Sequence, residues 1–268
     1  MGSQTPLKQP VKGIIFDYGA TIDSNGMHWA EVIWQGYQSA GVILDKALFR
    51  KAYVHGERSL ATHPYILPHH NFLELLQIKI RIQFEYLKAN ARFHYGSGEE
   101  GKPLLQIEGE DISPEDIRKK ITPEELRFQD AIAEYCYRYA ADCIAKALPV
   151  LEYLSGKYRL VLVSNFYGNI ESVLKDFGLI HLFPDIVESA VVGIRKPDPA
   201  IFALGVEKTG ETPESVVVVG DSYSKDIEPA TALGCQTIWI KGIGWDDKEE
   251  GFQHDRIISD FAMLSSLL

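Results

Sequence analysis

Cysteine and long hydrophobic runs are scarce in this 268-residue sequence. The three cysteines, Cys136, Cys143 and Cys235, are an odd number and form no Cys-x-x-Cys pair, so we expect neither a disulfide framework nor a thiolate metal site. No run approaches the ~18 apolar residues of a membrane span, and the polar first ten residues lack the apolar stretch of a secretory signal. We therefore expect a soluble, cytoplasmic protein with no membrane partner.

Positive charge is also in short supply. The sequence has 27 lysines and arginines against 37 aspartates and glutamates, and its formal net charge is -10 at pH 7. Such a charge repels nucleic acid in general, so we expect no nucleic-acid partner. An anionic substrate would have to be held by a local cluster of donors. The composition carries no prediction of the oligomeric state.

What the sequence does have is a set of short, β-branched runs. Runs that are apolar throughout are typical of buried parallel strands. Helical stretches separate the later runs, which predicts an α/β fold with a parallel sheet covered on both faces. Gly156 and Gly234 stand where the preceding helices should end. The predicted strands are "GIIFD" (13–17), "LVLVS" (160–164), "VVVVGD" (216–221) and "QTIWI" (236–240), and "DIVESAVV" (185–192) is also strand-like.

Residues 24–145 have a different character, with long helical periodicity and no equally clear buried strand. Leu73, Leu76, Ile80 and Phe84 recur at steps of three and four, which favours a helix although "IKIRIQF" also alternates like a strand. We predict a core domain of residues 1–23 and 146–268 and an inserted, mainly α-helical cap domain of residues 24–145.

Two further features of this insertion can be predicted. Thr122, Pro123 and Glu125 match an N-cap, a first helical position and a capping box, so a helix should run from about Thr122 to the region before Pro149. The polar, glycine-bearing segment 96–116 should be a surface loop or a small hairpin.

Polar residues stand at the ends of three predicted strands. Asp17, Ser164 and Asp221 each end or directly follow a strand, and ligands of open parallel sheets bind outside the carboxyl ends of the strands. Each residue alone is better explained as a helix N-cap. All three together, with "RKPDP" (195–199) after a further strand-like run, indicate a site.

These residue types suit phosphoryl transfer. A carboxylate can attack phosphorus and form an aspartyl-phosphate. Asp221 and Asp226 in "GDSYSKD" offer, with Asp17, hard oxygen ligands for Mg²⁺, and three carboxylates packed together imply a cation. Lys196 supplies a positive charge that can meet phosphoryl oxygens.

Four segments together resemble the haloacid dehalogenase superfamily of hydrolases. They are "FDYGATID", "VSN", "RKPDP" and "VVGDSYSKDI", in that order, and they extend across the chain. The resemblance implies a Rossmann-like core, a mobile helical cap inserted after the first strand, and Mg²⁺-dependent phosphatase chemistry on a small phosphorylated metabolite.

The resemblance also implies roles for particular residues. Carried over by position, Asp17 is the nucleophile and Lys196 the charge-stabilising lysine. Asp221 and Asp226 are metal-site acids, joined by Asp17 and by the backbone carbonyl of Gly19. The substrate-binding residues are Ser164, which offers a phosphate-binding hydroxyl, Asn165, Thr21 and Lys196.

Gly19 departs from the family pattern. Phosphatases of this family usually have a second aspartate there, which protonates the leaving group, and general acid–base help is typically worth ~10²–10⁴-fold in rate. Two nearby residues could supply the proton instead. Asp23 stands one residue before the family's acidic position, but a structural role as a cap or turn residue explains it better. His28 has a suitable unperturbed pKa, although a lone histidine is usually structural. A substrate with a good leaving group would need no proton donor.

Three other functions stay open. A metal-free dehalogenase also lacks the second aspartate, although Asp221 and Asp226 would then be unbalanced charge. A phosphonatase-like enzyme would recruit a cap lysine, for which Lys46, Lys51, Lys79 and Lys88 are available. A phosphate-binding protein could have kept the pocket and lost turnover.

Overall fold

The computed structural model describes residues 7, 10–109, 121–244 and 251–268. The chain divides into two compact units, one formed by residues 1–29 and 140–268 and the other by residues 30–139. Both boundaries fall inside helices, namely α1 (Trp29–Ser39) and α4 (Pro123–Ser155). The assignment of core and cap domains stays a prediction, and the two units are described separately.

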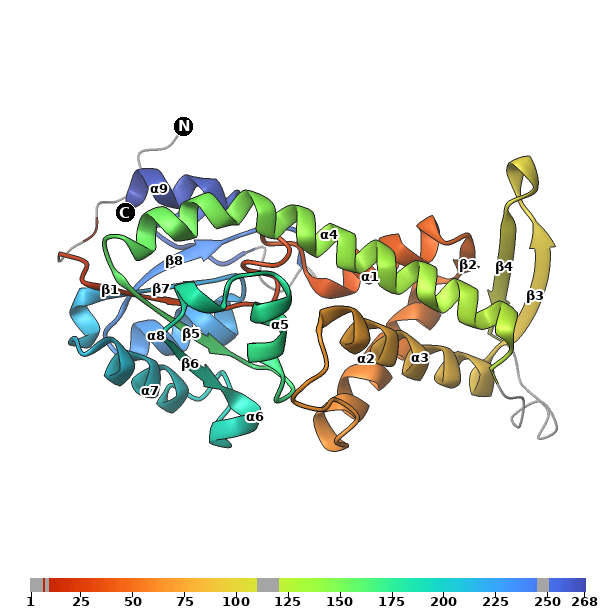
Figure 1. Cartoon of the computed structure of the whole chain (residues 1–268), viewed down its shortest axis with the longest axis horizontal. Coiled ribbons are helices and arrows are strands. Elements are labelled where there is room, and N and C mark those ends of the chain that lie inside the picture. Colours follow the sequence, from red (N-terminus) through yellow and green to blue (C-terminus); the bar gives the residue numbers. More distant parts are fainter. Residues whose placement is uncertain (1–6, 8–9, 110–120, 245–250) are drawn as a thin grey trace. The chain divides into compact units, whose positions relative to one another are not determined.

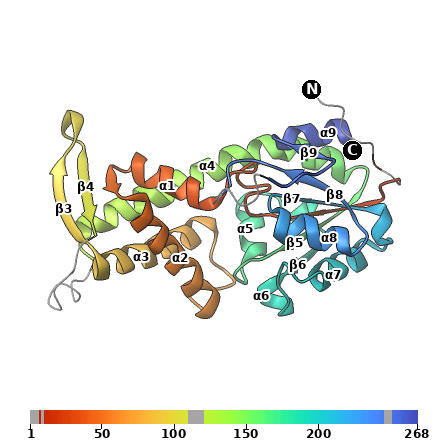
Figure 2. The same cartoon turned by 180° about the vertical axis from the view of Figure 1, so that it is seen from behind.

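The first unit is built on a six-stranded, fully parallel sheet of order β6-β5-β1-β7-β8-β9. Figure 1 shows α9 and the C-terminal part of α4 on one side of this sheet and α7 and α8 on the other, and Figure 2 shows the same from behind. The predicted α/β class with a parallel sheet is confirmed. The strands are β1 (Gly13–Phe16), β5 (Arg159–Ser164), β6 (Asp185–Glu188), β7 (Val216–Gly220), β8 (Gln236–Ile240) and β9 (Ile257–Ile258).

Apolar burial explains why these runs became strands. Every residue of β1, β7 and β8 is buried, as expected for central strands with helices on both faces. Between the strands lie α5 (Ile170–Asp176), α6 (Ser189–Val192), α7 (Ala200–Thr209) and α8 (Glu228–Ala232), and α9 (Leu264–Leu267) follows β9. As predicted, both glycines stand at helix ends. Gly156 directly follows α4, and Gly234 follows Leu233, the C-cap of α8.

One strand-like run was only partly a strand. Residues 185–188 form the edge strand β6, but residues 189–192 turn into the short helix α6. Of the strand-like run 185–192, therefore, only the first half is a strand. Four extended residues at a sheet edge leave too brief a pattern for the sequence to delimit.

The second unit packs α1, α2 (Lys46–Thr62), α3 (Phe72–Asn90) and the first part of α4 with a small sheet of order β2-β4-β3. Its strands are β2 (Val42–Leu44), β3 (Arg92–Ser97) and β4 (Pro103–Glu108). The helix predicted around Ile80 is α3. The segment predicted as a loop or hairpin forms the antiparallel β3–β4 pair up to residue 108, and its residues 110–116 lie outside the described residues.

The absence of clear strands from this region was a wrong prediction. β4 buries Leu105 and Ile107 on alternate positions, while five of the six residues of β3 are exposed. A strand with one solvent-exposed face carries little apolar signal, so the composition predicted a surface loop or a small hairpin for residues 96–116 without distinguishing them.

The long helix α4 begins as predicted but ends later. Thr122 and Glu125 form the predicted capping box, with the Thr122 N–H donating to Glu125 Oε2 at 2.6 Å and the Glu125 N–H donating to Thr122 Oγ1 at 3.2 Å. The helix continues through Pro149 to Ser155, so the predicted end before Pro149 was wrong. A proline inside a helix costs about 3 kcal/mol, and burial of Leu151 and Leu154 in the following turn offsets this.

Among the described residues, no helix is both long and apolar enough to cross a membrane.

Candidate active site

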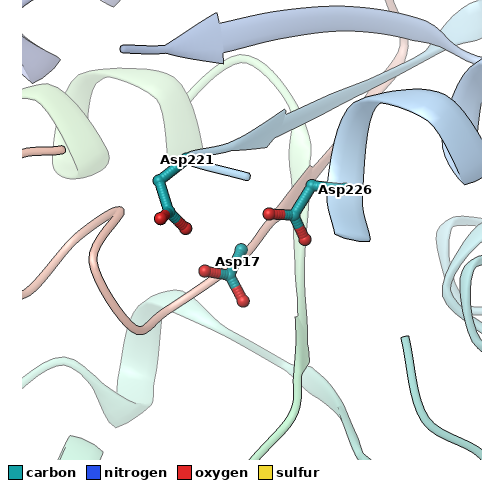
Figure 3. Close-up of side chains that lie close together, drawn as sticks. All are labelled: Asp17, Asp221 and Asp226. Carbon is teal, nitrogen blue, oxygen red and sulfur yellow. The ribbon is translucent and has the colours of Figure 1, made fainter. Parts of the chain in front are cut away.

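Three carboxylates meet at the carboxyl edge of the sheet. Asp17 directly follows β1 and Asp221 directly follows β7, and these two strands are parallel neighbours. Asp226 lies in a one-turn π-helix, Tyr223–Ile227, just beyond β7. Figure 3 shows the three side chains turned toward one another, and one oxygen of each lies within 4.8 Å of the others.

The position of Asp17 follows from the strand pairing. Its backbone N–H donates to Val219 O at 2.9 Å, which continues the β1–β7 ladder by one residue. The side chain is 9% exposed. The carboxylate is therefore held at the point where the sheet ends and the loops begin.

Lys196 lies between two of the carboxylates. Its Nζ donates to Asp17 Oδ1 at 2.5 Å and to Asp226 Oδ1 at 2.7 Å, and its side chain is 2% exposed. Charge-assisted hydrogen bonds of this length are the strong kind. Lys196 thus contacts two of the predicted acids directly. Asp17 lies 179 residues from it in the sequence, and Asp226 lies 30 residues from it.

Thr21 holds the other oxygen of Asp17. Its Oγ1 donates to Asp17 Oδ2 at 3.0 Å and lies 3.4 Å from Asp221 Oδ1. A hydroxyl has one proton, so it satisfies one carboxylate at a time. Both oxygens of Asp17 therefore have a donor, which fixes the plane of the carboxylate.

The cluster carries more negative than positive charge. Burial, reinforced by the neighbouring charge of Asp226, raises the pKa of Asp17 to about 6 even though Lys196 opposes the shift. Burial and the charges of Asp17 and Asp226 raise the pKa of Asp221 well above its ordinary value. Burial disfavours the charged form of Lys196, but the two carboxylates outweigh this and raise its pKa.

This charge balance fits a divalent cation. Three carboxylates face one ammonium group, and oxygen ligands at such spacing are those that Mg²⁺ prefers. A cation among them would favour the ionised carboxylates that burial disfavours. The residues able to hold it are Asp17, Asp221 and Asp226.

Gly19 has room for a side chain. A Cβ placed there would meet no atom within 4 Å, whereas the following residue, Ala20, has a φ of 64°. The missing acidic group is therefore not excluded by crowding at the position itself.

Asp23 is engaged in its own loop. Its Oδ1 accepts the Ala20 N–H at 2.7 Å, and its Oδ2 accepts the indole N–H of Trp29 at 2.9 Å. Because both oxygens stabilise the 20–29 turn, this arrangement favours the structural role for Asp23 over that of a proton donor. His28 is held through its backbone N–H, which donates to Ile243 O at 2.9 Å.

The loop after β5 carries Ser164 and Asn165. Ser164 is the last residue of β5, which pairs with β1, and it is 1% exposed. Asn165 bonds to the backbone of Lys196: its Oδ1 accepts the Lys196 N–H at 2.9 Å, and its Nδ2 donates to Lys196 O at 3.1 Å. The roles of both residues toward a substrate stay predictions.

Sequence reasoning missed two residues that support the site. The Glu188 carboxylate accepts the Gly168 N–H at 2.5 Å and lies opposite Ser164 in the sheet. The indole N–H of Trp239 donates to the backbone carbonyl of Asp221 at 2.6 Å. Glu188 ends β6 only because the strand is shorter than its strand-like run, and Trp239 is an apolar residue one position before the end of β8, so a search for polar residues at predicted strand ends passed over both.

The sheet order and the carboxylate cluster define a class of hydrolase, and comparison with known proteins names it. Residues 11–234 match the haloacid dehalogenase-like hydrolases, and the chain belongs to this family.

Individual relatives cover only parts of the chain. The haloacid dehalogenase-like hydrolase domain-containing protein 3 of Danio rerio is 44% identical over 73 residues, which is 27% of this chain and 30% of that protein. The phosphoserine phosphatase of Thermus thermophilus is 37% identical over 92 residues, or 34% of this chain and 37% of that protein. The chain thus matches about a third of the length of these curated relatives.

A solved structure of a dehalogenase with an intermediate complex resembles the whole chain. It has a TM-score of 0.57 at 14% identity, covering 98% of this chain and 99% of that one. At this identity the likeness concerns the fold alone.

Proposed function

We propose that this protein is a Mg²⁺-dependent, phosphatase-type hydrolase that acts on a small phosphorylated metabolite through an aspartyl-phosphate on Asp17. The observation that carries the proposal is the cluster of Asp17, Asp221 and Asp226 around the buried Lys196. Similarity to a phosphoserine phosphatase over part of the chain supports the substrate class. The unit of residues 30–139 takes the place of the cap in this proposal.

The reaction has two displacements. An oxygen of Asp17 attacks phosphorus, the bond from phosphorus to the leaving oxygen breaks, and the leaving oxygen takes up a proton. Water then attacks phosphorus, the bond to Asp17 breaks, and inorganic phosphate and the free carboxylate result. Both steps need the Asp17 oxygens fixed and the phosphoryl charge compensated.

The residues of the chain meet these needs as follows. Lys196 and Thr21 each donate to one oxygen of Asp17, and Lys196 provides positive charge beside the attacking group. Ser164 can donate a hydroxyl to a phosphoryl oxygen. Mg²⁺ would be held by Asp17, Asp221, Asp226 and the backbone carbonyl of Gly19. When bound, it would neutralise the charge of the carboxylates and of the phosphoryl oxygens.

The leaving group receives no proton from residue 19. With Asp23 engaged by Ala20 and Trp29, the proposal gives this carboxylate no part in protonating the leaving group. Loss of a general acid slows poor leaving groups most. Acyl phosphates and aryl phosphates should therefore be turned over better than alkyl phosphates.

Phosphate release from acetyl phosphate, p-nitrophenyl phosphate and a panel of alkyl phosphates, with and without Mg²⁺, tests the proposal. Asp17→Asn should abolish turnover because it removes the nucleophile while keeping the shape. Gly19→Asp should raise turnover of alkyl phosphates by ~10-fold or more, since a Cβ there meets no atom within 4 Å and general acids contribute ~10²–10⁴-fold.

Other results would change or contradict the proposed function. Full activity of Asp17→Asn contradicts the mechanism. Chloride release from a 2-haloacid without metal would make the protein a dehalogenase. Binding of Mg²⁺ and phosphate with no turnover of any substrate would make it a phosphate-binding protein.

A further inference from the structure

Asn165 faces the backbone of Lys196 with its whole amide group. The Oδ1 acceptor takes the Lys196 N–H at 2.9 Å, and the Nδ2 donor reaches the carbonyl of the same residue at 3.1 Å. Only one orientation of the amide satisfies both groups, because the N–H must meet an acceptor and the carbonyl a donor. The pair joins the end of β5 to the segment after α6, 31 residues further on.

Lys196 in turn has little freedom. Its ammonium group bonds to Asp17 at 2.5 Å and to Asp226 at 2.7 Å in a side chain that is 2% exposed. A displacement of its backbone would have to shift the ammonium group or strain the side chain. A misplacement of about 1 Å in a catalytic arrangement can cost ~10²-fold in rate.

The loop that carries Asn165 is itself held in place. The Gly168 N–H donates to Glu188 at 2.5 Å, and Glu188 lies opposite Ser164, the residue before Asn165, in the β5–β6 pair. Asn165 therefore stands on an anchored loop and bonds to the backbone of Lys196. This is the arrangement expected of a residue that orients another residue.

We infer that Asn165 is a positioning residue that sets the place of Lys196 between Asp17 and Asp226, and that it is not the substrate ligand that its neighbour Ser164 is expected to be. The inference rests on the proposed function for its effect on catalysis. Its structural part, the two bonds to the Lys196 backbone, can be tested without turnover.

The first test is amide hydrogen exchange at Lys196, followed by NMR. Asn165→Ala removes the acceptor, so the Lys196 N–H should exchange at least ~5-fold faster, because the amide loses the hydrogen bond that protects it. Asn165→Asp keeps the acceptor and should retain most of the protection. Unchanged exchange in Asn165→Ala would overturn the inference.

The second test separates kcat from KM for p-nitrophenyl phosphate. Asn165→Ala should lower kcat by ~10–100-fold with KM within about threefold of wild type, since a misplaced Lys196 stabilises the transition state less. A KM raised more than ~10-fold at unchanged kcat would make Asn165 a substrate ligand instead.

Ser189→Ala is the matched control. It removes a buried side-chain bond from the same loop at Phe166 and touches neither Lys196 nor its carboxylate partners. It should leave kcat within about twofold of wild type and leave the Lys196 exchange rate unchanged. If Ser189→Ala reproduces both effects of Asn165→Ala, the effects are due to loop loosening and the inference fails. If wild type itself shows no turnover, the proposed function fails, and the exchange experiment still decides whether Asn165 holds Lys196.

Discussion

At the scale of single residues, the site consists of charged groups whose oxygens and ammonium hydrogens are already bonded to one another. Asp17 receives donors on both oxygens, and Lys196 donates to two carboxylates. Such a network is rigid because each group limits the movement of the next. Its cost is the crowding of three carboxylates in a buried place, which appears in the raised pKa values of Asp17 and Asp221.

The pH dependence of the rate should reveal this crowding. The nucleophile must be ionised, and burial raises the pKa of Asp17 to about 6, so kcat/KM at limiting Mg²⁺ should fall as the pH drops through about 6. A cation beside Asp17 favours the ionised form, so saturating Mg²⁺ should move this acid limb to lower pH.

Rate profiles at two Mg²⁺ concentrations check this expectation. Asp260→Asn, which removes an exposed helix-capping carboxylate from the same unit, should leave the limb in place. A limb that stays put or moves to higher pH as Mg²⁺ rises would contradict the expectation.

Trp239 should tune the metal site through Asp221. Trp239 is 1% exposed, and its indole N–H donates to the Asp221 carbonyl at 2.6 Å. Trp239→Phe keeps most of the apolar bulk but removes this donor, so Mg²⁺ affinity measured by calorimetry should fall by ~10-fold, as for other residues that orient metal ligands. An affinity within twofold of wild type would mean that the backbone at Asp221 is held by other contacts.

At the scale of elements, close packing of helices on the sheet keeps the strand ends in register. In α7, Gly205 faces the sheet so closely that a Cβ there would lie 2.6 Å from Val163 Cγ2 and 3.0 Å from Ile15 Cδ1. Val163 precedes Ser164 and Ile15 precedes the end of β1. The helix thus packs directly on the two strands that carry Asp17 and Ser164.

Gly205→Ala should therefore destabilise the protein. Alanine favours a helix interior over glycine by ~1 kcal/mol, but overpacking typically costs ~1–3 kcal/mol, so the expected net loss is up to ~2 kcal/mol. Chemical denaturation measures it. Gly251→Ala, where a Cβ meets no atom within 4 Å, should change the free energy of unfolding by less than ~0.5 kcal/mol. A stabilised Gly205→Ala protein would mean that α7 is free to move outward.

Helices and strands also differ in how well the local sequence pattern predicts them. α3 and the start of α4 have caps and apolar spacing that local chemistry determines. The end of α4 does not follow local rules, because helix packing beyond Pro149 outweighs the lost hydrogen bond. β3 and β6 lack a buried face of sufficient length, so their pairing with neighbours decides that they are strands.

At the scale of the whole molecule, metal binding at the proposed site should be coupled to folding stability. The pKa of Asp221 is higher in the folded protein than in the unfolded chain, owing to burial and to Asp17 and Asp226. Stability from such a group is present below the unfolded value of 3.8 and is lost as the pH rises through the folded value. Without metal at pH 7.5, Asp221 should therefore lower stability.

Thermal unfolding tests this coupling. Asp221→Asn should raise the Tm of the metal-free protein at pH 7.5 by a few degrees, because it removes a repelled charge, at about 2–4 °C per kcal/mol for a chain of this size. Mg²⁺ at 100 times its Kd should stabilise wild type by about 2.7 kcal/mol, or roughly 5–10 °C, and Asp221→Asn much less. A metal-free Asp221→Asn protein that melts below wild type, or equal Mg²⁺ shifts in both proteins, would contradict the coupling.

The sequence by itself determined the class of fold and where the chemistry should lie. Runs such as "VVVVGD" can be buried on both faces only as central parallel strands, so Asp17, Ser164 and Asp221 had to stand at one edge of a sheet. The tertiary structure decided how the side chains there are paired: Lys196 with both Asp17 and Asp226, Asn165 with the Lys196 backbone, and Asp23 with Trp29. Strand burial is a property of a few consecutive residues, whereas the partner of a polar group at a strand end depends on register and packing of segments that the chain brings together from far apart.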